Sequence, residues 1–243
     1  DKESATVYIF NKDNELIVYV HSPLPIIRAS IHIDGHVKKS KKVVIDARQF
    51  TPQCNFEDLD VFLDTNDNVA IKQNSILIFE SLTGLQSSSV ANIEFRSSPE
   101  FFEPDELCTD ALAANTIVPP LGACNAILGL GGVCLKIEHD AFRGFGLSGL
   151  YANNMTGSLD IVDNTVQQTQ YAFLIKNVVK IARLEKNHVQ GEDVQRVNQI
   201  YNGSDPSQCL VAICRMGFYL FNIRESNVFV VSNIFENFDG FSA

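Results

Sequence analysis

Hydrophobic residues gather in short runs that alternate with segments rich in Asn, Gly and Ser along most of the chain. Few of these runs show the three-to-four-residue spacing of an amphipathic helix. Runs rich in Val, Ile, Leu and Phe between turn-forming residues are typical of β-strands. The sequence therefore predicts an all-β protein.

The pattern at the N-terminus is that of antiparallel strands. The runs ATVYIF and ELIVYV flank the polar residues 11–14, as in a β-hairpin, and Asp34-Gly35 marks a second turn. We expect residues 1–42 to form an N-terminal β-hairpin cap. The remaining residues, 43–243, form a second unit in which long loops are predicted near 98–122 and 191–209.

An internal repeat organises the second unit. Four segments align without gaps, and they span residues 125–140, 149–164, 172–187 and 218–233. Their offsets are 24, 23 and 46 residues, the last being twice 23. A repeat of this length indicates one structural unit stacked on the next, and the doubled offset predicts an insertion of about one repeat before Phe218.

The columns of this alignment separate inward from outward positions. The inward columns are aliphatic, with Leu135, Leu159, Ala182 and Val228 in one and Ile137, Ile161, Leu184 and Val230 in the other. The column between them holds Lys136, Asp160, Arg183 and Phe229. Because neighbouring residues of a strand point to opposite faces, we expect a stacked core under an outward ladder of alternating charge.

A fourth column predicts a structural ladder at a corner of the chain. Its members are Asp140, Asn164, Asn187 and Asn233. Asn and Asp tolerate the left-handed backbone of a sharp bend, and stacked amides can hydrogen-bond to one another. We therefore expect these four residues to occupy one bend in successive repeats.

A period of about 23 residues with inward aliphatic residues and an Asn-bearing corner resembles the right-handed parallel β-helix superfamily, the pectin-lyase-like folds. The resemblance covers residues 125–237 well and residues 43–97 loosely. The expected fold class is all-β, a right-handed parallel β-helix with an N-terminal antiparallel β cap. A β-sandwich or propeller whose strands happen to align is the alternative.

The resemblance also implies a kind of active site. Lyases and glycosidases of this fold that act on acidic sugars place charged residues on one outward sheet or beside it, and a lyase needs a base and cations that neutralise the uronate. The catalytic candidates on this interpretation are Lys186, His188, Arg183 and His139. Acidic residues in the same or neighbouring columns favour surface charge ladders as the competing interpretation.

Calcium is the cofactor that the resemblance implies. Asp64, Asn66 and Asn68 begin like a calcium-binding loop. Val69 stands where the sharp turn would favour Gly, and Ser75 stands where a bidentate Glu would fall. A solvated turn is therefore the competing interpretation.

Charge and cysteine content narrow the partners and the compartment. The chain has 19 basic and 29 acidic residues, a net charge of -10, which argues against a nucleic-acid partner. No apolar run is long enough for membrane insertion. The six cysteines lack metal-binding spacing, so they favour disulfides in an exported protein over buried free thiols. We therefore expect an extracellular, cell-surface or periplasmic protein.

These observations favour an exported β-helix binding or structural module that recognises a surface glycan or a protein partner. The alternative is a polysaccharide lyase or glycoside hydrolase that acts on an acidic polysaccharide. Phenylalanines crowd the end of the sequence, at Phe218, Phe221, Phe229, Phe235, Phe238 and Phe241. Because an uncapped coil exposes its interior and its unpaired strand edges, we also expect association through the C-terminal end of the coil.

Overall fold

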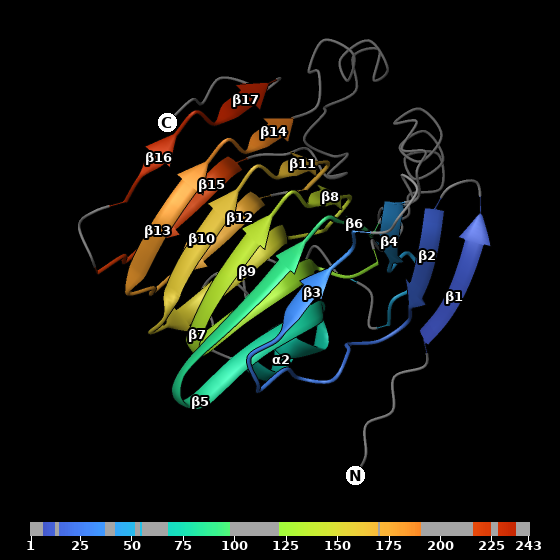
Figure 1. Cartoon of the computed structure of the whole chain (residues 1–243), viewed down its shortest axis with the longest axis horizontal. Coiled ribbons are helices and arrows are strands. Elements are labelled where there is room, and N and C mark those ends of the chain that lie inside the picture. The colour runs from blue at the N-terminus through green and yellow to red at the C-terminus, as the bar shows by residue number, and fades with distance from the viewer. Residues whose placement is uncertain are drawn as a thin grey trace, which may run out of the picture.

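A computed structural model describes residues 7–12, 15–36, 42–51, 54, 68–97, 122–169, 171–190, 216–224 and 228–236. Within these ranges the chain is built from strands and one short helix, α2 (Asn68–Gln73). The prediction of an all-β protein is confirmed. Figure 1 shows the strands side by side along the molecule, from the N-terminal hairpin at one end to the last strands at the other.

One of two sheets has eight strands. In spatial order they are β1 (Val7–Lys12), β2 (Glu15–Val20), β4 (Lys42–Asp46), β6 (Ile93–Arg96), β8 (Ala141–Arg143), β11 (Thr165–Gln167), β14 (His188–Gln190) and β17 (Ile234–Glu236). The pair β1–β2 is antiparallel, and every later neighbouring pair is parallel. The hairpin is therefore the edge of a parallel sheet.

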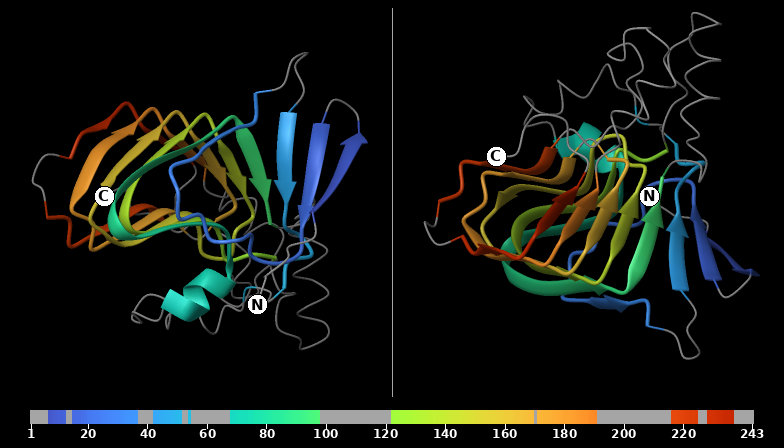
Figure 2. Two further views of the ribbon diagram at one scale, coloured as in Figure 1. Left: turned by 60° about the horizontal axis from the view of Figure 1, so that its bottom comes forward. Right: turned by 90° about the horizontal axis from the view of Figure 1, so that it is seen from above.

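The second sheet has nine strands. Its main path is β15 (Met216–Phe221), β12 (Tyr171–Lys176), β9 (Ser148–Met155), β7 (Asn125–Glu138), β10 (Ser158–Val162), β13 (Lys180–Glu185) and β16 (Val230–Val231). The long strand β5 (Ser75–Ala91) pairs with β7, and β3 (His32–Asp34) pairs with β5. The sheet curls around the interior, as Figure 2 shows.

The chain passes through both sheets again and again, and we call one such passage a rung. Three successive rungs are β9–β10–β11, β12–β13–β14 and β15–β16–β17. Ile161 pairs with Ile137 on one side and with Leu184 on the other, and Leu184 pairs with Val230. The predicted stacking of the repeats is confirmed, and the sheets that result are parallel.

One predicted column is wrong at a single position. Leu159 pairs with Ile181 rather than with Ala182, because the register between β10 and β13 shifts after Leu159. The shift buries Ile181, which is 1% exposed, and leaves the smaller Ala182 half-buried. A β-bulge of this kind adds one residue to a strand, which an alignment without gaps does not represent.

The N-terminal region differs from the expected cap in one element. The hairpin β1–β2 is antiparallel as predicted, but β3 pairs in parallel with β5. Gly35, expected in a turn, instead passes close to the backbone of Asn92, where a Cβ atom would collide with the carbonyl oxygen. Strand β2 pairs with β4 in one sheet, so strand pairing joins the predicted cap, residues 1–42, to the residues that follow. The domain boundary after residue 42 stays a prediction.

Aromatic rings form part of the core between the sheets. Phe95 stacks on Phe142 with ring centroids 5.3 Å apart, and Phe173 stacks on Phe218 at the same distance. Phe142 meets Phe173 edge-on at 6.4 Å, so the rings connect four rungs. Such pairs stabilise a core beyond the area that they bury.

A disulfide joins Cys54 to Cys124 across 70 residues of sequence. Closing a loop of this length stabilises the fold by about 4 kcal/mol in the chain-entropy account. The disulfide interpretation is confirmed for this pair, whereas Cys134 is a free, half-buried thiol. Cys108, Cys209 and Cys214 lie outside the described residues.

Candidate functional site

The four predicted ladder residues lie together at the corner between the two sheets. The backbone N–H of Asp140 donates to Asn164 Oδ1 at 2.9 Å, and that of Asn164 donates to Asn187 Oδ1 at 3.1 Å. The N–H of Asn187 continues the series to Asn233 Oδ1 at 2.9 Å. Each side-chain oxygen thus accepts a backbone N–H from the preceding rung. These bonds fix successive rungs in register.

The amide nitrogens of the ladder point back to the preceding rung. In each case Nδ2 donates to a backbone carbonyl oxygen: Asn164 to that of Ile137 at 3.1 Å, Asn187 to that of Ile161 at 3.0 Å, and Asn233 to that of Leu184 at 2.7 Å. Asn164 and Asn187 are almost fully buried. A buried amide is costly unless it is hydrogen-bonded, and here both its donor and its acceptor are used.

The expected left-handed backbone occurs one residue earlier than predicted. Positive φ angles of 56° or 57° occur at His139, Asp163, Lys186 and Ser232, each directly before a ladder residue. The preceding residue makes the bend, and this leaves the ladder side chain free to point along the stack. Lys186 and His139, two of the catalytic candidates, are therefore corner residues.

The four catalytic candidates do not converge. Arg183 lies on β13 in the nine-stranded sheet, His188 lies on β14 in the eight-stranded sheet, and Lys186 and His139 lie at the corner. All four contact an acidic side chain: Arg183 and Lys186 form ion pairs with Asp160 at 2.7 Å and Glu185 at 3.2 Å, and ring nitrogens of His188 and His139 lie 3.0 Å from carboxylate oxygens of Glu236 and Asp163. Arg183 and Asp160 belong to the predicted ladder of alternating charge, in which strand register places Lys136 next to Asp160 on the other side, while the ion pair of Lys136 is with Glu138 on its own strand.

The calcium candidates are only partly placed. Asp64 and Asn66 lie outside the described residues, and Asn68 is the first residue of helix α2, where a turn was expected. Among the described residues, no group of three or more His, Cys, Asp or Glu side chains could hold a metal ion. Calcium binding therefore stays a prediction.

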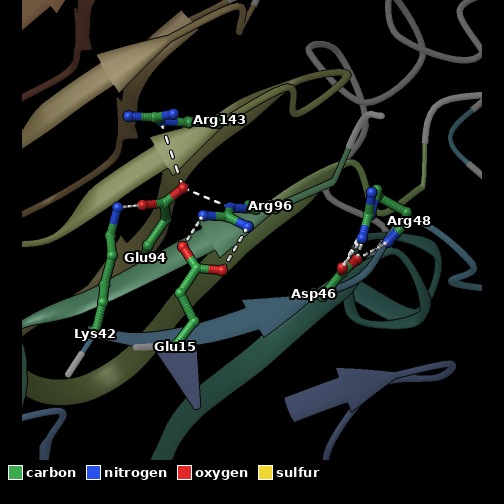
Figure 3. A network of polar contacts seen from close by, with 7 residues as sticks. All are labelled: Glu15, Lys42, Asp46, Arg48, Glu94, Arg96 and Arg143. Carbon is green, nitrogen blue, oxygen red and sulfur yellow. Dashed lines mark hydrogen bonds and ion pairs between the residues drawn. The ribbon is translucent and has the colours of Figure 1, made fainter. Parts of the chain in front are cut away.

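A buried network of charges that the sequence did not reveal lies on the outer face of the eight-stranded sheet (Figure 3). Phe95 points into the aromatic core, so Glu94 and Arg96 on either side of it point to the opposite face. Glu94 has no exposed side-chain surface, and Arg96 has 8%. Arg96 Nε donates to Glu94 Oε1 at 2.5 Å, and its two terminal nitrogens donate to the carboxylate of Glu15 at 2.8 and 3.3 Å.

Two further cations complete this network. Lys42 forms an ion pair with Glu94 Oε2, and Arg143 Nε lies 3.5 Å from Glu94 Oε1. Hydrogen bonds from Arg96 hold the pKa of Glu15 below its ordinary value. Lys42 and Arg143 are 44% and 46% exposed, whereas the carboxylate of Glu94 is covered. The network therefore presents positive charge to solvent on a protein whose net charge is negative.

A row of polar side chains continues from the network across the sheet. Strand register aligns Arg96, Arg143, Gln167, Gln190 and Glu236 in that order. Gln167 Nε2 donates to Gln190 Oε1 at 2.6 Å, so adjacent members contact one another. We call these five residues the outer polar row. Its members are spaced by the distance between neighbouring strands, about 4.8 Å.

A second charged cluster ties β5 to its surroundings. Arg28 Nη2 donates to Glu80 Oε2 at 2.8 Å, and Lys72 of helix α2 forms an ion pair with Glu80 Oε1. Burial pushes the pKa of Glu80 upward, but the hydrogen bonds from Lys72 and Arg28 outweigh it and hold the pKa below its ordinary value. The cluster connects three segments, which accounts for it as structural support.

The chain matched no protein-family model, no curated protein and no solved structure. Within the described ranges, no helix has the length and apolar character that a membrane crossing requires.

Glu94 holds three cations, so replacing it is expected to be costly. In Glu94→Gln, Arg96 stays largely buried and keeps Glu15 as its one ionic partner in this network, and we expect the free energy of unfolding to fall by about 3 kcal/mol. Urea denaturation measures this change. The control is Glu185→Gln, which removes the partner of two exposed cations and should cost at most about 1 kcal/mol. Equal losses in the two variants would contradict the role given to Glu94.

Proposed function

We propose that the chain is a right-handed parallel β-helix of the pectin-lyase-like kind and that it is a binding module for an acidic glycan. The parallel pairing of segments 23 or 24 residues apart and the corner ladder support the fold. The glycan proposal rests on one observation, the outer polar row with the exposed cations Arg143 and Lys42 at its N-terminal end.

The chemistry of the row suits a linear acidic polymer. Arg143 contacts Glu94 and still exposes 46% of its side chain, so part of its guanidinium can donate to a carboxylate or sulfate, and Lys42 adds a point charge on the other oxygen of Glu94. The amides of Gln167 and Gln190 offer further donors and acceptors to sugar hydroxyls. Side chains repeated at strand spacing match a ligand whose own groups repeat along an extended chain.

The alternative is catalysis by a polysaccharide lyase or glycoside hydrolase. It is supported by His188, which lies on the same outer face as Arg143, one column away. A lyase needs its base and its neutralising cations around one substrate carbon. Because Arg183 lies on the other sheet and Lys186 at the corner, the positions of the candidates favour binding over catalysis.

We propose that the protein is exported and is extracellular, attached to the cell surface or periplasmic. The disulfide Cys54–Cys124 supports this, because such bonds persist mainly in oxidising compartments.

Arg143→Ala tests the glycan proposal. We expect wild-type protein to bind polygalacturonate in calorimetry, with an affinity that falls as salt rises, and Arg143→Ala to weaken binding about tenfold by removing a charge-assisted hydrogen bond. Arg183→Ala on the other sheet is the matched control and should bind as wild type does. Absence of binding, or equal loss in both variants, would refute the proposal. Release of unsaturated uronate that His188→Ala abolishes would establish the lyase instead.

The exposed end of the coil supports a second proposal, association of two copies of the chain. In the last described rung, Val230 and Phe235 are 50% and 47% exposed, whereas the equivalent Leu184 and Val189 one rung earlier have no exposed surface. Within the described ranges, β15, β16 and β17 each pair on one side only. Such edges accept further strands, and a second copy supplies strands with the same repeat.

Sedimentation velocity across a range of concentrations tests this second proposal. We expect wild-type protein to self-associate and Val230→Lys to remain monomeric, because the introduced charge would have to be buried between the copies. Leu82→Lys replaces another exposed apolar residue, at the register shift of β5, and should associate as wild type does. A wild-type protein that stays monomeric at every concentration would overturn the proposal.

A further inference from the structure

The corner ladder contains one chemical exception. At its N-terminal end stands Asp140, where the next three rungs carry Asn. Each of those Asn residues donates from Nδ2 to a carbonyl of the rung before it. Asn164 donates to Ile137, which is the strand partner of Ile161, three residues before Asn164. The residue three before Asp140 is Ile137, and its strand partner on the preceding rung is Val90. The carbonyl of Val90 is therefore the equivalent acceptor for Asp140. An ionised Asp cannot make this hydrogen bond.

The surroundings of Asp140 oppose a negative charge. The residue is 2% exposed, and its Oδ1 accepts the backbone N–H of Ile93 at 2.8 Å. Its Oδ2 is buried, and no donor hydrogen-bonds to it. Burying a carboxylate with an unsatisfied oxygen is costly, whereas a protonated carboxyl carries a donor on that atom.

The charged groups around Asp140 add to this effect. Electrostatic repulsion acts on it from the carboxylates of Glu138 on β7 and Asp34 on β3. Asp163, before the ladder residue of the next rung, lies 3.0 Å from His139 Nδ1 and does not contribute to the pKa shift of Asp140. Burial raises the pKa of Asp140 well above its ordinary value; the hydrogen bond from Ile93 counteracts this, and the two acidic neighbours reinforce it.

We propose that Asp140 is a pH-sensitive joint in the coil: as a neutral acid, its Oδ2–H donates to the carbonyl of Val90 in place of the Asn amide, and its ionisation loosens the corner there. This corner joins the rung that contains β5 and β6 to the rung that contains β7 and β8. The N-terminal strands, with Lys42 and Glu94 of the charged network, lie on one side of this corner, and the later rungs lie on the other.

The direction of the pH effect follows from the tighter proton binding of the folded state. The contribution of Asp140 to the free energy of unfolding is fully present below the ordinary Asp pKa of about 3.9, and it is lost as the pH rises through the folded-state pKa of Asp140. An Asn at this position keeps its donor at every pH. Asp140→Asn therefore removes this dependence while it preserves the shape of the ladder.

Amide hydrogen exchange at Ile93, measured across the acid-to-neutral range and corrected for the intrinsic exchange rate, tests the joint. We expect opening in wild type to increase at least about tenfold over this range relative to Asp140→Asn. Asp163→Asn, at an exposed position of the next corner, is the control and should keep the wild-type profile. Matching profiles in wild type and Asp140→Asn would overturn the proposal.

A second measurement needs no variant. Carbon-13 detection of the side-chain carboxyl groups of wild-type protein follows the ionisation of each Asp. We expect Asp140 to remain protonated at pH values above the ordinary Asp pKa of about 3.9. Titration of Asp140 at or below the ordinary Asp value would overturn the proposal, whether or not the variant folds.

Discussion

The hydrogen bond from the backbone of one rung to the corner side chain of the next is the interaction on which the rest of the structure depends. Strand pairing alone allows a rung to slip, and a slip by one residue would turn every inward side chain outward. The ladder prevents this, because Asn187 Oδ1 receives both the backbone N–H and the side-chain amide of Asn164 at one fixed position. The aromatic stack of Phe95, Phe142, Phe173 and Phe218 then packs in a register that is already set.

The same register gives the outer surface its chemical regularity. With Phe142 and Val166 fixed inward, Arg143 and Gln167 are fixed outward and lie beside one another. The binding surface that we propose is thus a consequence of the core, and its spacing is that of the strands. The buried pair of Glu94 and Arg96 gives the row a rigid end, where negative charge is covered and positive charge is exposed.

The sequence predicted the stacking of the rungs because the repeat segments align at offsets of 24, 23 and 46 residues. The alignment could not show the bulge after Leu159, since a shift of one residue in one strand pair leaves no trace in a pattern of apolar residues. The left-handed residues, such as Lys186, were missed for a related reason: their types vary, and only their position before the Asn is constant.

The charged network was missed because its members come from segments outside the four aligned repeats. Arg96 and Glu15 are separated by 81 residues in the sequence and meet only because β2, β4 and β6 are neighbours. The signal that was present is local: Glu94 and Arg96 alternate with Ile93 and Phe95, which places two charges on one face of a strand inside a sheet. Which ligand a protein binds depends on its exposed side chains, and a pattern of inward residues does not predict these.

The most direct test of the ladder is a through-hydrogen-bond scalar coupling, measured by nuclear magnetic resonance, between the backbone amide nitrogen of Asn164 and the side-chain carbonyl carbon of Asn187. The account predicts a resolved coupling together with slow exchange of the Asn164 amide proton. A rapidly exchanging amide without coupling would show that rungs 23 residues apart are not held together at this corner.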